Sequence, residues 1–110
     1  SGVSRYNLTS SAQLIELLKW MYKSDYKDDF IYTLPGGGWP KSTLEKRLTS
    51  EAGLVRAKTG GLSGARNLAG YITSQKYGDV AFSILMNGYI GSSSKYTRLQ
   101  NQIVKAVIYD

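Results

Sequence analysis

The sequence predicts an α+β fold, in which a three-stranded antiparallel meander is flanked by one amino-terminal and one carboxyl-terminal helix. Two observations lead to this prediction. Apolar residues recur at helical spacing near each end of the chain, and three apolar runs separated by glycine-containing turns follow one another between them. With 110 residues, of which 42% are hydrophobic, the chain is expected to form one globular domain at most.

The first helix is expected over residues 11–23. Ser10 and Gln13 have the spacing of a capping box at its start. Its apolar positions recur every three or four residues: Leu14, Leu17, Leu18 and Met21. Residues 1–9 are polar and without period, so a loop is expected there.

The segment between this helix and the meander is expected to be mostly irregular. Asp25, Asp28 and Asp29 lack the spacing, glycine and terminal glutamate of a calcium loop, so a solvated turn is the better interpretation. A triple glycine between Pro35 and Pro40 excludes regular structure. Residues 43–48 could form one or two helical turns that bury Leu44 and Leu48.

The first strand is expected to start at Val55 and to break at the glycines after Thr59, and the other two are expected at residues 68–73 and 80–86. Residues 75–79 connect the second and third strands, with Gly78 available for a positive φ. The third strand is apolar on both faces, so helices should cover both sides of the sheet. A final helix from about residue 95 should turn these side chains inward: Tyr96, Leu99, Ile103, Val107 and Ile108.

The composition excludes several kinds of chemistry. Cysteine and histidine are absent, which removes disulfides, thiolate metal sites and histidine-based catalytic triads. We expect no cofactor and no bound metal. No apolar run approaches the roughly 18 residues of a membrane-spanning helix. The net charge is +6, and from residue 52 onward seven Lys and Arg face two Asp and Glu, which favours an anionic partner.

The stretch Val55-Arg56-Ala57-Lys58-Thr59-Gly60-Gly61-Leu62 is the strongest candidate for a site. Alternation places Val55 and Ala57 on one face and Arg56 and Lys58 on the other. A lysine and a hydroxyl at the end of a strand, followed by glycines that leave the backbone N–H groups accessible, could form an anion cradle. The competing interpretation is an ordinary surface lysine.

Lys58-Thr59-Gly60 is also the third signature of the penicillin-recognising serine enzymes. Alone it is weak, since it arises by chance in roughly a few per cent of chains of this length. The flanking residues also resemble the class C, low-molecular-mass penicillin-binding type, which comprises D-alanyl-D-alanine carboxypeptidases and endopeptidases. The matching stretches occur in the same order over nearly the whole chain: residues 1–8, Leu34-Pro35, Ser42-Thr43-Leu44 with Arg47, residues 57–60, residues 68–71, residues 81–84 and Asn87-Gly88.

This resemblance implies that residues 1–110 are the carboxyl-terminal portion of a transpeptidase-like domain with a β-lactamase-like fold. The nucleophilic serine, its lysine and the Ser-x-Asn pair would lie upstream. The Ser-x-x-Lys spacings at Ser24 and Ser92 lie in a polar turn and at a helix start, and we interpret both as accidental. The isolated chain is therefore expected to have no peptidase activity. It should pair with the amino-terminal remainder of the protein, or self-associate through an exposed sheet edge.

By the same resemblance, the full protein would cleave D-Ala-D-Ala bonds of peptidoglycan stem peptides through an acyl-serine intermediate and would react with β-lactams. Lys58 and the backbone N–H of Gly61 would be catalytic, the latter as an oxyanion-hole donor. Thr59 and Gly60 would bind substrate. The location would be the periplasm or another extracytoplasmic part of the cell envelope.

Relatives usually carry Thr or Ser at the position of Gly61, so one hydroxyl for the terminal carboxylate is missing in this chain. We expect weaker discrimination for a free carboxylate and relatively more endopeptidase activity. The alternative function is a binding module of the same fold that holds wall peptides without cleaving them. Nucleic acid is not expected as a partner, because neither an RRM nor an OB strand pattern is present.

Overall fold

The computed structural model describes residues 11–62, 65–87 and 94–109. Three predictions fall outside this range: the loop at residues 1–9, the helix cap at Ser10 and the Ser-x-x-Lys spacing that starts at Ser92. The described elements are, in chain order, α1 (Ser11–Tyr22), α2 (Lys27–Tyr32), a 3₁₀ turn (Thr49–Glu51), β1 (Val55–Leu62), β2 (Ala65–Ser74), β3 (Gly78–Asn87) and α3 (Ser94–Tyr109).

The three strands form an antiparallel meander in the order β1-β2-β3, which confirms the predicted fold class. The prediction that β1 breaks at the glycines is wrong. Gly60 pairs with Asn67 and Gly61 with Arg66, so the strand continues to Leu62. Pairing with β2 supplies the order that glycine itself does not favour. Gly78, the first residue of β3, has a φ of +71°, and the positive φ was predicted.

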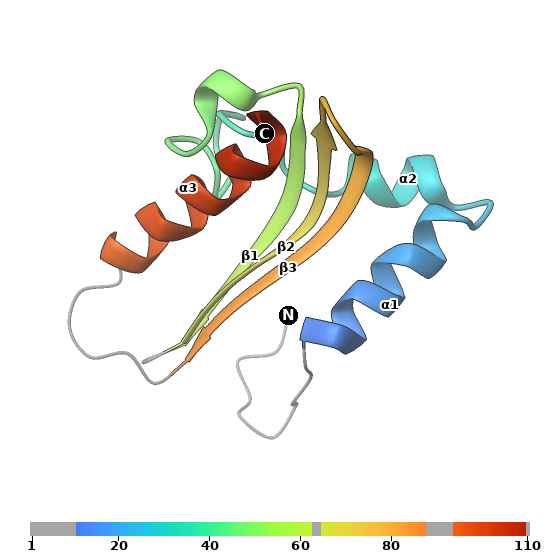
Figure 1. Cartoon of the computed structure of the whole chain (residues 1–110), viewed down its shortest axis with the longest axis horizontal. Coiled ribbons are helices and arrows are strands. Elements are labelled where there is room, and N and C mark those ends of the chain that lie inside the picture. Colours follow the sequence, from blue (N-terminus) through green and yellow to red (C-terminus); the bar gives the residue numbers. More distant parts are fainter. Residues whose placement is uncertain (1–10, 63–64, 88–93, 110) are drawn as a thin grey trace.

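The helices lie on both faces of the sheet (Figure 1). α3 and the segment before β1 cover one face, whereas α1 and α2 lie on the other. The end of α3 is tied to the β2–β3 connection by a hydrogen bond from the Gln75 N–H to the Ile108 carbonyl. The expectation that both faces are covered is confirmed.

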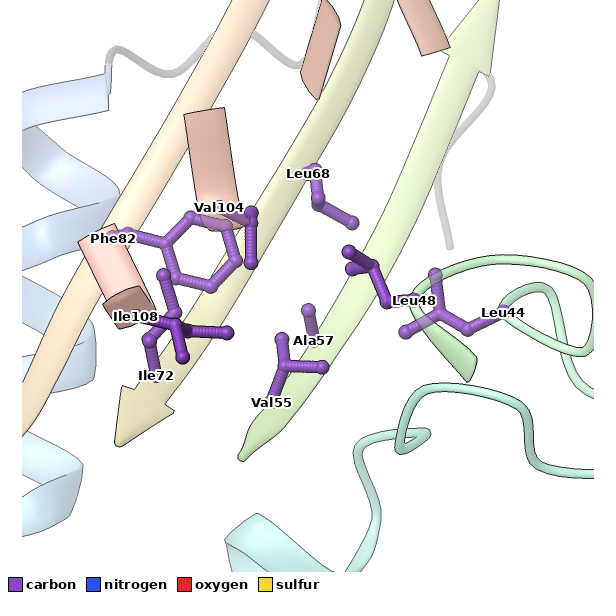
Figure 2. Packing of buried hydrophobic residues seen from close by; sticks show 9 residues of the cluster. All are labelled: Leu44, Leu48, Val55, Ala57, Leu68, Ile72, Phe82, Val104 and Ile108. Carbon is purple, nitrogen blue, oxygen red and sulfur yellow. The ribbon is translucent and has the colours of Figure 1, made fainter. Parts of the chain in front are cut away.

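The larger core lies between the sheet and α3 (Figure 2). Alternation along each strand sends one set of side chains to this face, and residues from α3 and the preceding loop complete the cluster. Its buried members are Leu44, Leu48, Val55, Ala57, Leu68, Ile72, Phe82, Val104 and Ile108. Gly70 belongs to the same face, and a Cβ there would overlap the Arg56 carbonyl and the Ala57 backbone. Close approach of β1 and β2 therefore requires glycine at this position.

A smaller core lies between the sheet and α1, where Leu18, Leu34 and Tyr71 are buried. The Tyr71 hydroxyl donates a hydrogen bond to the Leu18 carbonyl at 2.6 Å. Burial, and secondarily the charge of Tyr22, raise the pKa of Tyr71.

Two local predictions before the sheet require correction. The solvated turn near Asp28 is in fact α2, with Asp28 and Asp29 exposed in its first turn, where carboxylates stabilise a helix. Residues 43–48 form turns and not a helix, because Leu48 adopts a left-handed conformation with a φ of +54°. Leu44 and Leu48 are nevertheless buried as expected.

The predicted inward face of α3 is partly wrong. Ile108 is buried and Tyr96 and Val107 are half-buried, but Leu99 is 44% and Ile103 is 39% exposed. The buried positions are instead Gln100, Val104 and Ile108, because Gln100 turns inward to accept a hydrogen bond from Arg47. None of the described helices has the length and apolar character needed to span a membrane.

Candidate functional site

Among the described residues, Pro35 and Gly36 cover the outer edge of β1 along its first part. Gly36 forms an isolated antiparallel bridge with Arg56, and the Ala57 N–H donates to the Pro35 carbonyl at 2.9 Å. Within the described residues, no further backbone pairing continues this cover past Ala57. We call the uncovered part of this edge, from Lys58 to Gly61, the open margin.

Alternation along β1 determines which backbone groups face the open margin. The Leu54 carbonyl accepts a hydrogen bond from Thr73 of β2, whereas the Ala57 N–H points outward to Pro35. Successive residues of a strand turn their backbone groups to opposite edges. The N–H and carbonyl groups of Thr59 and Gly61 therefore point outward, and those of Lys58 and Gly60 point to β2.

Lys58 brings its charge to the same margin. Its side chain is exposed, and its Nζ donates a hydrogen bond to the Thr59 carbonyl at 2.7 Å. Since that carbonyl faces outward, the ammonium lies over the edge of the strand. In the part of the chain that the structure describes, the one ion pair within 4.0 Å is Lys19 with Glu16, so no carboxylate there neutralises Lys58.

Gly60 is exposed, and a side chain there would meet little among the described residues. A Cβ at Gly60 would have Asn67 Cβ as its nearest neighbour, at an ordinary contact distance of 3.9 Å. Unlike Gly70, Gly60 is therefore not required by internal packing. Its small size is consistent with access for a group from outside the described residues.

The covering segment is held in place by Arg56. Its Nε donates to the Leu34 carbonyl at 2.7 Å, and its Nη2 donates to the Tyr32 carbonyl at 3.0 Å. The guanidinium also lies 4.1 Å from the centre of the Trp39 ring. Burial lowers the pKa of Arg56, with a smaller opposing effect from Tyr32. Arg56 thus fixes Pro35 and Gly36 against β1 and determines where the open margin begins.

Thr59 is half-buried and occupies the face of the sheet that packs against α3. Two arginines that the sequence did not identify as site residues also lie on this face. Arg66 pairs with Gly61 across β1 and β2. Arg47 donates from Nε to Asn101 Oδ1 at 3.0 Å, and from Nη2 to Gln100 Oε1 at 3.1 Å. Counting residues across the β1–β2 hairpin would have shown that Arg66 lies opposite Gly61. Nothing in the sequence around Arg47 indicates where that residue lies.

The two arginines are close enough to affect each other. The pKa of Arg47 is lowered, first by burial and second by the positive charge of Arg66. Thr59, Gly61 and these two guanidiniums thus share one face, and Lys58 adds its ammonium at the edge. This arrangement can bind an anion through a hydroxyl, outward N–H groups and several positive charges.

Other features of the described residues lie away from this margin. A small cavity of about 90 Å³ lies near the β2–β3 connection and is lined by Lys19, Tyr22, Lys23, Tyr71, Asp79 and Ala81. Its Asp79 accepts hydrogen bonds from Tyr22 and Thr73. No group of three or more His, Cys, Asp or Glu side chains suited to a metal ion is found among the described residues.

Comparison with known families gives a match over most of the sequence. The family described as the D-Ala-D-Ala carboxypeptidase 3 (S13) family matches residues 1–107. A D-alanyl-D-alanine carboxypeptidase of an Actinomadura species is 35% identical over 97 residues, which cover 83% of this chain and 18% of the relative. D-alanyl-D-alanine carboxypeptidase DacB of Haemophilus influenzae is 32% identical over 97 residues, covering 81% of this chain and 19% of the relative.

Solved structures give the same result for the fold. Penicillin binding protein 4 (dacB) from Haemophilus influenzae, in a complex with a β-lactam, matches with a TM-score of 0.86 and 28% identity. This match covers 100% of this chain and 27% of that protein. The chain thus has the fold of part of a penicillin-binding protein, and it spans about a fifth of the length of the two curated relatives.

Proposed function

The chain belongs to the D-Ala-D-Ala carboxypeptidase 3 (S13) family, and on this premise we propose that it supplies the Lys-Thr-Gly strand of a serine-type D-Ala-D-Ala carboxypeptidase or endopeptidase. The substrates would be peptidoglycan stem peptides, and β-lactams would acylate the same serine. The nucleophile, its lysine and the Ser-x-Asn pair would come from an amino-terminal remainder. Residues 1–110 would then form the carboxyl-terminal portion of a transpeptidase-like domain.

The open margin is the observation that carries this proposal. Cover by Pro35 ends at Ala57, one residue before Lys58, although β1 itself continues to Leu62. A strand edge with outward N–H groups can receive an extended peptide by strand addition. A strand edge without cover from the described residues, next to a lysine that none of the described carboxylates neutralises, is suited to a peptide that ends in a carboxylate.

Each residue of the margin receives a role in this proposal. The Lys58 ammonium would raise the local positive potential, hydrogen-bond the serine of the Ser-x-Asn pair and help to relay protons. The Thr59 hydroxyl would bind the terminal carboxylate, and Gly60 would leave room for the substrate. The outward N–H of Gly61 would be one oxyanion-hole donor, and the nucleophile's own N–H would be the other.

Exposed apolar side chains support the proposed pairing with an amino-terminal remainder. Within the described residues β3 is an edge strand, and large apolar side chains are exposed on both helical layers and on β3 itself. They include Leu17 and Trp20 of α1, Leu85 of β3, and Leu99 and Ile103 of α3. Apolar surface of this kind is usually covered by another chain segment or by a second copy. If sedimentation shows that the isolated chain is a stable monomer, and if it binds little of a dye that reports exposed apolar surface, neither pairing with a remainder nor self-association is supported.

Labelling with a fluorescent penicillin tests the proposed function. The full-length protein is expected to form a covalent, acid-stable adduct and to release D-alanine from a peptide ending in D-Ala-D-Ala. A protein that binds such a peptide without forming any adduct would instead be the alternative, a non-catalytic module that holds wall peptides. We propose an extracytoplasmic location in the cell envelope for either function, because that is where the substrate occurs.

A further inference from the structure

The small cavity near the β2–β3 connection plays no part in the proposed function. It lies between α1 and the sheet, on the face opposite α3 (Figure 1). Tyr71 belongs to its lining and pairs with Arg56 in the covered part of β1, so the cavity is separate from the open margin. Its volume is about 90 Å³, whereas a single water needs about 10–15 Å³. The cavity can therefore hold several waters or one small organic molecule.

Asp79 gives the cavity a carboxylate whose position is fixed. One of its oxygens accepts a hydrogen bond from the Tyr22 hydroxyl, and the other accepts one from Thr73 Oγ1 at 3.1 Å. Both donors are neutral, so they orient the carboxylate without neutralising it. A carboxylate has more acceptor sites than these two bonds use, and the remaining sites can receive an ammonium group.

Lys19 and Lys23 give the same cavity two positive charges from the side of α1. They lie one helical turn apart, and the Lys23 N–H donates to the Lys19 carbonyl at 3.3 Å. The Lys19 ammonium lies 3.8 Å from Glu16, and such an exposed pair is weak. Among the described residues, neither lysine forms an ion pair with Asp79, and Lys23 forms none at all. Charges of opposite sign thus line one cavity without neutralising each other.

Two tyrosine rings form part of the cavity wall. The centres of the Tyr22 and Tyr71 rings are 5.8 Å apart, and the Tyr71 hydroxyl is fixed by its hydrogen bond to the Leu18 carbonyl. The Lys27 ammonium lies 3.8 Å from the centre of the Tyr22 ring, which shows that a cation can be accommodated against this ring. Ala81 adds a small apolar surface. The cavity therefore combines both signs of charge with apolar contacts for a short side chain.

We propose that this cavity binds a small zwitterion, namely an α-amino acid with a short side chain, whose ammonium binds Asp79 and whose carboxylate binds Lys23 and Lys19. A ligand with a single charge is attracted by one side of the cavity and repelled by the other, whereas a zwitterion is attracted by both. Under the proposed function the protein releases D-alanine, which is a ligand of this class. The choice of D-alanine rests on the proposed function, but the binding of a small zwitterion does not.

Ligand-observed NMR titrations of the full-length protein test the inference. The protein is first acylated with a β-lactam, which closes the catalytic site to D-alanine. D-alanine is then compared with propionate, which lacks the ammonium, and with D-alaninamide, which lacks the carboxylate. We expect a Kd of about 1 mM for D-alanine, since so small a ligand gains little binding energy. Each analogue should bind about 10-fold more weakly. Equal binding of all three, or no binding of D-alanine, would overturn the inference.

Two substitutions locate the binding in this cavity. Asp79→Asn and Lys23→Gln each remove one charge at nearly constant size and should weaken D-alanine binding about 10-fold. Lys23→Gln should also reduce the preference over D-alaninamide, and Asp79→Asn the preference over propionate. The matched controls are Asp28→Asn on α2 and Lys105→Gln on α3, both at exposed positions outside the cavity lining. Unchanged affinity in both cavity variants would contradict the assignment. If Asp79→Asn does not fold, Lys23→Gln decides alone, because Lys23 is exposed.

The outcome is distinguishable from that of the proposed function. If the full-length protein does not react with a β-lactam, the proposed enzymatic function fails, and the same titrations are made on the unmodified protein. Zwitterion-selective binding that depends on Asp79 and Lys23 then still supports the inference. A protein that is acylated normally but does not bind D-alanine at this cavity overturns the inference and leaves the proposed function intact.

Discussion

The two halves of β1 differ although they belong to one continuous strand. From Val55 to Ala57 the outer edge is covered by Pro35 and Gly36, and the inward side chains are at most 1% exposed. From Lys58 to Gly61 no described segment outside the sheet covers this edge, and the residues are polar or lack a side chain. The covered half therefore contributes to stability, and we propose that the open half takes part in binding. Substitutions in the two halves should accordingly affect different measurements.

The largest expected effect is on the rate of acylation and comes from a substitution in the open half. Lys58→Ala in the full-length protein should slow acylation by a fluorescent penicillin about 10²- to 10⁴-fold, since it removes a group proposed to relay protons. Because Lys58 is exposed, thermal unfolding should hardly change. Lys105→Ala, also exposed, is the control. If Lys58→Ala is acylated at the normal rate, the proposal that the open half takes part in the reaction is contradicted.

The next effect is on stability and comes from a residue of β2 that pairs with the covered half of β1. Ile72 pairs with Val55 and is 1% exposed, so Ile72→Ala should lower the free energy of unfolding by about 2–5 kcal/mol. The same substitution at Ile103, which is 39% exposed on α3, should cost much less. Urea unfolding measures both, and equal losses would contradict the assignment of the core.

A smaller and more local effect should follow from releasing the covering segment. Arg56→Ala removes the two hydrogen bonds to the Leu34 and Tyr32 carbonyls and should cost about 1–3 kcal/mol. The Ala57 amide, which donates to Pro35, should then exchange with solvent faster. The Thr73 amide, bonded to Leu54 on the other side of β1, serves as the internal reference. Unchanged protection of Ala57 would show that Arg56 does not hold the cover.

The smallest expected effect concerns alkaline pH. Burial raises the pKa of Tyr71, so the protonated hydroxyl is favoured in the folded state. Its contribution to stability is fully present below the ordinary tyrosine pKa of about 10. It is lost as the pH rises through the higher pKa of the folded state. Tyr71→Phe should therefore weaken the decline in the free energy of unfolding above about pH 10. Tyr77→Phe, at a side chain that is 63% exposed, should leave this decline unchanged. A decline that is the same in both variants would contradict the prediction.

The sequence was sufficient for the meander, its alternating faces and the helices at both ends, because each has a clear period. It was insufficient for α2, whose six residues are too few to show one. The inward face of α3 was partly missed because Gln100 is buried by its bond to Arg47 and not by apolar character. Arg66 was missed although its position opposite Gly61 follows from counting residues across the β1–β2 hairpin.

The most direct test of the open margin is a crystal structure of the full-length protein acylated by a β-lactam. We predict that the acyl carbonyl oxygen lies about 2.7–3.1 Å from the Gly61 N–H, with the ligand carboxylate at the Thr59 hydroxyl and Lys58 beside it. An adduct whose carbonyl oxygen points away from β1, or an open margin covered by another segment of the protein, would contradict this account.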